Sequence, residues 1–167
     1  KAEKHLVENG VFASNTSSIP ITSLAEKSAS PEKFIGIHFF SPVHKMKLVE
    51  IIKGKMTSTQ TLAKAFDYVL KIKKIPIVVN DSRGFYTSRV FERYTGEGMT
   101  LLTEGNSAKN IESAGKQAGF PVGPLAVIDE ISIGLAAHIR NQSWKDLKAE
   151  GKEIEAGPWD GVIDFMT

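Results

Sequence analysis

Two ionisable residues interrupt segments that are otherwise apolar, His38 within residues 34–40 and Glu50 within residues 46–52. If the two segments form a hairpin centred on His44, His38 and Glu50 stand opposite each other on one face, within contact distance. A carboxylate beside an imidazole fixes the tautomer of the ring and stabilises the cationic form of the ring. Such a pair can act as a general base, the histidine, and the residue that orients it, the glutamate. A buried carboxylate needs a partner in any case, so a purely structural ion pair is the alternative.

Polar side chains follow two of the predicted strands. Asn15 and Ser17 belong to the segment Asn-Thr-Ser-Ser that comes directly after residues 11–14, and Ser41 follows the strand that holds His38. In open α/β sheets, ligands bind outside the carboxyl ends of strands, which predicts a binding site where these groups gather. Asn, Thr and Ser also favour helix caps and turns, so a cap is the alternative explanation for the first segment.

Helices and strands alternate before about residue 80, which predicts a mostly parallel, doubly wound sheet. Pro76 is expected at the beginning of the last strand or in an edge strand, because proline cannot donate to a neighbouring strand. The expected strands cover residues 11–13, 34–40, 46–52 and 75–79.

Three helices are expected beside these strands. The first covers residues 1–8, the second has Pro20 in its first turn and continues through Ala25, and the third follows the capping-box pattern Thr57-x-x-Gln60. The third helix is amphipathic. Its predicted buried face carries Leu62, Phe66, Val69 and Leu70.

The pattern changes after Gly84, and no convincing strand follows. The sequence therefore predicts an α/β part, residues 1–80, followed by an all-α part, residues 81–167. The helices expected in the second part cover residues 85–105, a segment that Ser107 caps and that ends at residue 119, residues 124 to a break around 132–134, and residues 135–150.

Composition excludes several classes of protein. Hydrophobic residues make up 41% and charged residues 24% of the chain, as in globular proteins, and a net charge of +2 without a basic block does not support nucleic-acid binding. No apolar run approaches the roughly 18 residues of a membrane span. The chain has no cysteine, which excludes a thiolate metal site and fits a cytoplasmic protein. The first residue is Lys1 rather than Met, so we expect a piece of a longer polypeptide.

Metal binding has no support from histidine spacing either. His5, His44 and His138 lack the spacing of metal ligands with one another or with acidic residues. We therefore interpret them as surface or packing residues and expect no metal site.

Five segments, in order along the chain, resemble the L-3-hydroxyacyl-CoA dehydrogenase family: residues 13–18, 36–43, 46–52, 79–85 and 119–124. The pattern is most similar to the dehydrogenase part of the alpha subunit of bacterial multifunctional fatty-acid oxidation complexes. The resemblance implies that the first part is the C-terminal portion of a Rossmann-like NAD-binding domain. It implies that the second part is a helical domain for substrate binding and dimerisation.

The resemblance also implies an activity, the NAD-dependent oxidation of (S)-3-hydroxyacyl-CoA to 3-oxoacyl-CoA in fatty-acid beta-oxidation. His38 matches the family's catalytic histidine, and Glu50 matches the glutamate paired with it. Ser17 matches a serine near the nicotinamide and the substrate oxygen, and Asn15 would line the same edge of the cofactor. The implied partners are the acyl-CoA substrate, a second copy in a homodimer and a thiolase subunit of a larger complex.

Two positions depart from the family where it contacts its ligands. Ser41 lies where the family often has an asparagine that contacts cofactor and substrate, and Ser88 lies where it usually has another asparagine. Serine offers one hydroxyl where the amide offers two donors and an acceptor, so these contacts would be weaker or mediated by water. We expect these two serines to change the substrate range and the rate more than the reaction class.

The glycine-rich turn G-x-G-x-x-G, which holds the pyrophosphate of NAD, does not occur in the 167 residues. We therefore expect this chain alone to bind NAD poorly and to be inactive. Two other interpretations stay open: a dehydrogenase of a small beta-hydroxy acid, and a crystallin-like relative without activity. The presence of both His38 and Glu50 argues against the inactive relative.

Overall fold

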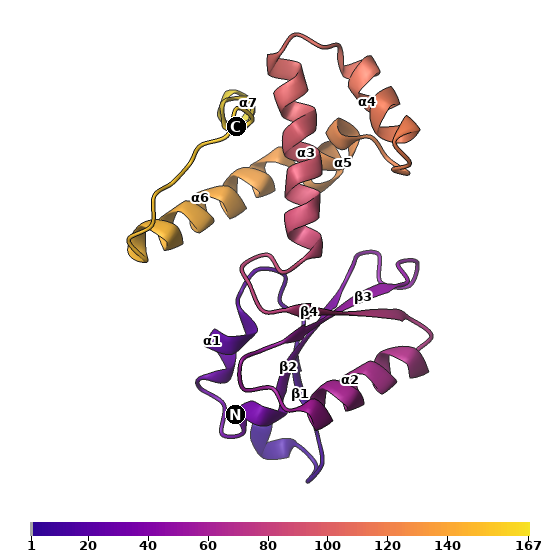
Figure 1. Ribbon diagram of the computed structural model, residues 1–167, viewed down its shortest axis with the longest axis vertical. Helices are drawn as coiled ribbons and strands as arrows, with labels where there is room; N and C mark the ends of the chain where they lie inside the picture. Colours follow the sequence, from indigo (N-terminus) through magenta and orange to yellow (C-terminus); the bar gives the residue numbers. More distant parts are fainter. Residues whose placement is uncertain (1) are drawn as a thin grey trace. The chain divides into compact units, whose positions relative to one another are not determined.

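The computed structural model describes residues 2–167 as two compact units, one that ends at Val90 and one that spans Phe91–Thr167 (Figure 1). The division falls inside helix α3 (Thr87–Thr103), whereas the sequence predicts a boundary after residue 80. Each unit has a hydrophobic core of its own.

The first unit contains the predicted mixture of strands and helices. The helix predicted over residues 1–8 is wrong: Lys1 lies outside the described residues, and the remainder holds only a 3-10 turn, Ala2–His5. Leu6 and Val7 are 36% and 77% exposed, so these two apolar side chains are not buried, and so short a helix depends on such packing. The elements of the unit are β1 (Phe12–Ser14), α1 (Ile21–Ala25), a 3-10 turn (Pro31–Lys33), β2 (Phe34–Phe39), β3 (Leu48–Lys53), α2 (Thr59–Lys71), β4 (Ile75–Asn80) and the start of α3.

The four strands form one sheet in the order β1-β2-β3-β4. β1 and β2 run parallel, as do β3 and β4, whereas β2 and β3 form the predicted antiparallel hairpin. The register places His38 directly opposite Glu50, which confirms the pairing expected from the sequence. Pro76 lies in β4 at an edge of this sheet, where its missing N–H removes no inter-strand bond.

Helices cover both faces of the sheet, with α2 on one face and α1 on the other (Figure 1). Successive side chains of a strand point to opposite faces, so β2 and β3 each contribute to two cores. Under α2 lie Ile35, Ile37, Val49, Ile51, Ala65 and Val69. On the other face lie Ile21, Ala25, Phe34, Ile52 and Phe85. By this alternation, His38 and Glu50 share the face of Phe85.

Helix α2 begins one residue later than its capping pattern suggests. Ser58 is the capping residue, and its hydroxyl accepts a hydrogen bond from the backbone N–H of Thr61 at 3.1 Å. Thr57 is not the cap, because its hydroxyl donates to the carbonyl of Phe34 at 2.7 Å and ties the helix start to β2. The capping box predicted at Thr57 is therefore wrong.

The buried face of α2 agrees with the prediction only in part: Val69 is buried and Leu62 packs against the core. Thr61, Ala65 and Val69 are the buried residues of the helix, whereas Phe66 and Leu70 are exposed. The four-residue spacing of 61, 65 and 69 lets small side chains face the sheet. The apolar pattern does not show that a close approach to a sheet favours alanine and threonine at two of these positions.

The second unit is helical, as predicted. Its core contains Met99, Ala137 and Ile163. The break predicted around residues 132–134 is present at Ser132, where φ is +75°, although the following helix starts earlier than expected, at Ile133. The helices are the main part of α3, then α4 (Ala108–Gln117), α5 (Pro124–Ile131), α6 (Ile133–Ala149) and α7 (Asp160–Met166).

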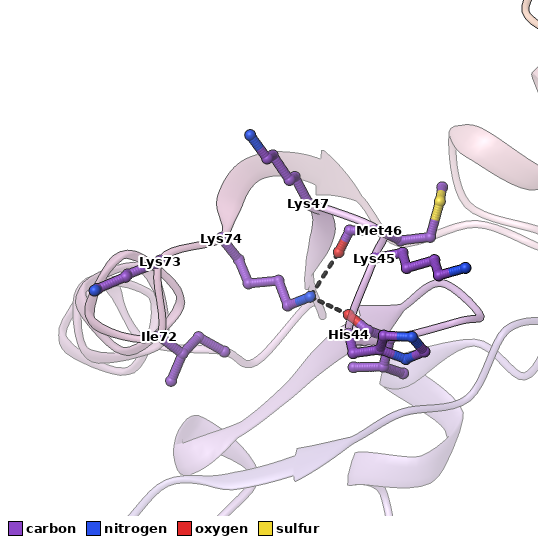
Figure 2. Close-up of a pocket in the computed structure, with 8 residues that line it drawn as sticks. His44, Lys45, Met46, Lys47, Ile72, Lys73 and Lys74 are labelled. Atoms are coloured by element: carbon purple, nitrogen blue, oxygen red, sulfur yellow. Dashed lines mark hydrogen bonds between the residues drawn. The ribbon is translucent and has the colours of Figure 1, made fainter.

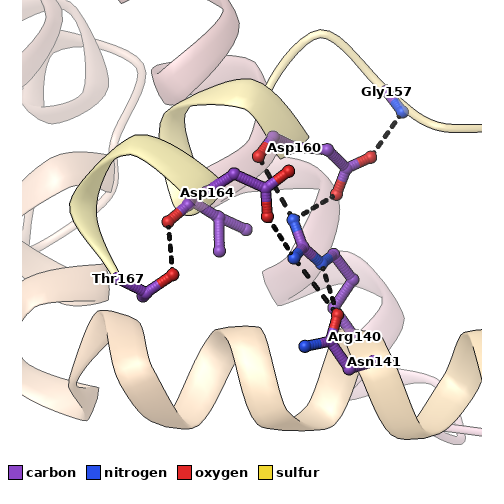
Figure 3. A network of polar contacts seen from close by, with 7 residues as sticks. Arg140, Asn141, Gly157, Asp160, Asp164 and Thr167 are labelled. Atoms are coloured by element: carbon purple, nitrogen blue, oxygen red, sulfur yellow. Dashed lines mark hydrogen bonds and ion pairs between the residues drawn. The ribbon is translucent and has the colours of Figure 1, made fainter.

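An arginine joins the last two helices of this unit. The Arg140 guanidinium on α6 forms ion pairs with Asp160 Oδ1 at 3.3 Å and with Asp164 Oδ1 at 2.5 Å (Figure 3). It also donates to the backbone carbonyl of Asp160, and the Asp160 carboxylate accepts from the N–H of Gly157. Arg140 therefore holds the start of α7 against α6.

Gly36 in β2 has no room for a side chain. A Cβ atom there would lie 2.8 Å from the Ile21 side chain and 2.9 Å from Cβ of Ile52. We expect Gly36→Ala to lower the free energy of unfolding by about 1–3 kcal/mol, because the added methyl group overpacks the core between α1 and the sheet. Urea denaturation followed by circular dichroism measures this change.

Gly161→Ala is the matched control, because a Cβ atom at Gly161 in α7 meets nothing within 4 Å. This control should leave stability unchanged or raise it. An equal effect of the two substitutions would contradict the close packing at Gly36.

Candidate active site

His38 and Glu50 form a buried ion pair across the β2–β3 hairpin. His38 Nδ1 lies 2.9 Å from Glu50 Oε2, and the two residues are 7% and 0% exposed. His38 is the fifth of the six residues of β2, so the pair lies near the carboxyl end of this strand. The strand register, rather than a flexible loop, sets the distance between the two groups.

The start of α3 supplies further donors to Glu50. Oε1 accepts hydrogen bonds from the backbone N–H groups of Tyr86 and Thr87 at 2.8 and 2.9 Å. Oε2 accepts from the Thr87 hydroxyl at 2.8 Å in addition to His38. Each carboxylate oxygen therefore has two donors, which fills the acceptor capacity of an ionised glutamate.

The hydrogen bonds decide the charge of Glu50. Burial raises the pKa of its carboxyl, but the bonds from His38, from the N–H and hydroxyl of Thr87 and from the N–H of Tyr86 outweigh burial and hold the pKa below its ordinary value. Because the ionised carboxylate only accepts, the network assigns the proton to Nδ1 of His38. Nε2 is then the ring nitrogen that can accept a proton from a ligand.

A tight backbone turn brings α3 to the pair. Gly84 and Phe85 both have positive φ, +70° and +46°, and this conformation is costly for a residue with a side chain. The turn buries the Phe85 ring, with its centroid 6.1 Å from that of His38, while Phe40 lies at 4.6 Å. Two aromatic rings therefore flank the imidazole.

The loop after β1 is anchored at both ends. Asn15 Oδ1 accepts a hydrogen bond from the backbone N–H of Phe39 at 2.9 Å, so Asn15 is attached to the strand residue next to His38. At the other end, the Asp81 carboxylate accepts from the N–H groups of Ile21 and Thr22 at 2.9 and 2.7 Å. Asn15 thus positions the loop that carries Ser17, and its NH2 group can still donate to a ligand.

Within residues 2–167, none of the three serines selected from the sequence forms a hydrogen bond with His38 or Glu50. Ser17 is exposed in the loop after β1, and Ser41 is exposed just beyond β2. Ser88 is half-buried in the first turn of α3, beside Thr87. Their predicted roles in cofactor or substrate binding stay predictions.

Sequence reasoning missed Thr87, Tyr86 and Asp81 as parts of this region. Nothing in the local sequence shows that a residue at position 86 or 87 reaches back to position 50. One signal was present: a buried carboxylate needs several donors, and His38 offers only one. That signal predicts further partners but does not identify them.

Asn15 and Ser17 lie directly after β1, at its carboxyl end. Their contact with the nicotinamide of NAD, which the resemblance implies, stays a prediction. A pyrophosphate needs free N–H groups at a helix N-terminus, but in α1 the N–H groups of Ile21 and Thr22 are already bonded to Asp81. This helix is therefore closed to a phosphate.

A surface hollow lies beyond the β2–β3 hairpin, between its tip and the turn after α2 (Figure 2). Lys74 Nζ donates to the carbonyl oxygens of Val43 and Met46, which ties this turn to the hairpin. The side chains of Lys45, Lys47 and Lys73 point away from one another in Figure 2, so their charges do not converge on a ligand. The arrangement is that of a solvated helix end.

Within residues 2–167, no group of three or more His, Cys, Asp or Glu side chains could hold a metal ion. No helix in the same range is both long and apolar enough to pass through a lipid bilayer.

Comparison with known proteins finds relatives of both parts of the chain. The fatty acid oxidation complex subunit alpha of Shewanella baltica is 45% identical over 137 residues, which make up 82% of this chain and 19% of that protein. The same subunit of Shewanella loihica is 46% identical over the same length. The chain therefore spans about a fifth of the length of these curated relatives.

Solved structures share its fold. The (S)-3-hydroxybutyryl-CoA dehydrogenase of Ralstonia eutropha has a TM-score of 0.78 at 37% identity, covering 85% of this chain and 51% of that one. The 3-hydroxybutyryl-CoA dehydrogenase of Escherichia coli K12 has a TM-score of 0.75 at 32% identity, covering 86% and 30%. The α/β part followed by a helical part is thus the Rossmann-like arrangement expected from the sequence.

Two family models account for nearly all of the sequence. Residues 1–82 match the 3-hydroxyacyl-CoA dehydrogenase NAD binding domain, and residues 84–159 match the C-terminal domain of the same enzyme family. On these matches, the chain belongs to the 3-hydroxyacyl-CoA dehydrogenase family.

Proposed function

We propose that this chain supplies the acid–base half of an NAD-dependent dehydrogenase that oxidises (S)-3-hydroxyacyl-CoA to 3-oxoacyl-CoA in fatty-acid beta-oxidation. The observation that carries the proposal is the buried His38–Glu50 pair, with 2.9 Å between Nδ1 and Oε2, near the carboxyl end of β2. Membership of the family supports the reaction class, and the pair supplies the proton acceptor that this reaction needs.

His38 acts as the general base in this proposal. As hydride leaves C3 of the substrate, the C3 hydroxyl proton passes to Nε2 of His38, and the C–O bond becomes a carbonyl. When bound, the nicotinamide of NAD+ supplies the hydride acceptor. The resulting imidazolium is stabilised by the Glu50 carboxylate through the Nδ1–H bond, and Glu50 itself takes up no proton.

The surrounding residues orient the ligands. Asn15 and Ser17 would face the nicotinamide, Ser41 would contact both cofactor and substrate, and Ser88 would contact the substrate from the first turn of α3. The Phe40 and Phe85 rings limit the access of water to the imidazole, which strengthens its interaction with Glu50.

We also propose that the helical unit takes part in assembly. Leu135 and Ile139 on α6 are 50% and 51% exposed, and Phe165 on α7 is 91% exposed. Apolar side chains exposed in this way favour self-association, here as a homodimer. The relatives named as subunits of a fatty acid oxidation complex support a larger assembly, with a thiolase subunit as the proposed partner. The cytoplasmic location stays a prediction.

The first test removes the base. In a protein that joins this chain to a glycine-rich NAD-binding half, we expect His38→Gln to lower kcat by roughly 10²–10⁴-fold, because glutamine cannot take the hydroxyl proton. NADH absorbance with (S)-3-hydroxybutyryl-CoA measures the rate, and free 3-hydroxybutyrate tests the alternative small-acid substrate. His44→Gln, at an exposed histidine in the hairpin, is the matched control. Near-normal turnover of His38→Gln would remove His38 from the mechanism.

The second test concerns the charge of Glu50. Its pKa is lowered in the folded protein, so the ionised group stabilises the fold above its ordinary pKa of 4.5, and this stabilisation is lost as pH falls through the folded pKa. We expect Glu50→Gln to lower the free energy of unfolding by about 1–3 kcal/mol at pH 7, with a smaller loss below pH 4.5.

Urea denaturation at a series of pH values measures this difference. Glu26→Gln is the control, because Glu26 is exposed at the end of α1. A loss of stability at Glu50 that does not change with pH would show that the carboxylate charge is not what stabilises the start of α3.

The third test concerns the cofactor. Because α1 is closed to phosphate and the glycine-rich turn is absent from these residues, we expect the 167-residue chain to show no saturable NAD binding at millimolar concentration. Isothermal titration calorimetry measures this, with a protein that includes the glycine-rich half as the positive control. Binding at micromolar concentration by the chain alone would contradict the expectation.

A further inference from the structure

Thr87 holds both oxygens of the Glu50 carboxylate from a single residue. Its backbone N–H donates to Oε1 at 2.9 Å, and its hydroxyl donates to Oε2 at 2.8 Å. The last torsion of a glutamate side chain is soft, so a free carboxylate rotates easily. The two bonds from Thr87 fix the plane of the carboxylate and direct Oε2 towards His38.

The hydroxyl also shares Oε2 with the imidazole. Oε2 accepts from His38 Nδ1 at 2.9 Å and from Thr87 Oγ1 at 2.8 Å, so the two donors divide the negative charge of one oxygen. A donor that stabilises a carboxylate reduces the charge available to a second donor on the same atom. Thr87 therefore weakens the support that Glu50 gives to the imidazolium.

We propose that Thr87 is a positioning residue that sets the strength of the base: its hydroxyl fixes Oε2 and moderates the stabilisation of protonated His38. The proposal rests on the proposed function only where it concerns turnover. The geometric part concerns the pair alone, and the lowered pKa of the Glu50 carboxyl agrees with it.

Three other side chains that lie beside the His38–Glu50 pair carry no charge. Ile77 on β4 lies opposite Glu50, and Phe40 and Phe85 lie beside the imidazole. These three neighbours of the pair are uncharged, so burial and the hydrogen bonds on Glu50 set its protonation.

Thr87→Val tests the proposal because valine keeps the shape and the backbone N–H but removes the hydroxyl. With one donor lost, Oε2 carries more charge towards His38, and the imidazolium is stabilised more strongly. In the protein that joins this chain to a glycine-rich NAD-binding half, we expect the acid limb of the kcat/KM profile to move to higher pH by about 0.3–1 unit, because protonated His38 cannot act as a base. In the 167-residue chain, we expect the Nδ1–H proton resonance of His38 to move downfield, as a stronger hydrogen bond requires.

Two control variants separate this effect from a general loss of structure. Thr87→Ser keeps the hydroxyl and should restore both the pH profile and the resonance of the wild type. Thr95→Val removes another buried hydroxyl of α3, one that bonds only to carbonyls of its own helix, and should change neither. Circular dichroism confirms that each variant is folded.

The outcomes distinguish this inference from the proposed function. A resonance and an acid limb that stay unchanged in Thr87→Val would overturn the role of Thr87, whatever His38→Gln shows. A resonance that moves in Thr87→Val, together with full activity of His38→Gln, would support the effect of Thr87 on the pair and overturn the proposed function. Equal changes in Thr87→Val and Thr87→Ser would also overturn the inference, because the hydroxyl would then have no part in them.

Discussion

A single buried carboxylate joins the two strands of a hairpin to the start of a helix that is distant in sequence. Glu50 on β3 pairs with His38 on β2 and accepts three further hydrogen bonds from Tyr86 and Thr87 at the start of α3. An unpaired charge in this position would be strongly unfavourable, so the hairpin register and the turn before α3 must both form for the fold to tolerate it. The candidate base is therefore held by the same interaction that starts the long helix.

Among the described residues, two other carboxylates accept hydrogen bonds from backbone N–H groups at the start of a remote helix. Asp81 accepts from the first N–H groups of α1, and Glu112 accepts from the N–H groups of Leu125 and Ala126 at the start of α5. The two serine caps, Ser58 and Ser107, are local and lie directly before their helices. Remote carboxylates stabilise helix starts as local caps do, and they also fix where each helix lies relative to a distant segment.

This difference explains what could be predicted from the sequence. The strand pattern and the pairing of His38 with Glu50 follow from apolar periodicity and hairpin geometry, and Ser107 is recognisable as a cap from its neighbours. The partners of Glu50 on α3 depend on a turn with positive φ at Phe85, a residue type that gives no sign of such a conformation. The face of α2 was predicted correctly for Leu62 and Val69 but not at Phe66, because close packing on a sheet selects Ala65 over the more hydrophobic Phe66.

Glu50 is bonded both to the catalytic candidate His38 and to the start of α3, so a glutamate at this position can be retained for either reason. A relative that had lost all catalytic activity would still need an acid at this position to begin α3, so natural selection for folding alone would preserve it. Retention of Glu50 without His38 is consequently no sign of a working enzyme. His38 contributes one of the four bonds on that carboxylate. Among homologues, replacement of this histidine would therefore identify the proteins that have lost the catalytic base.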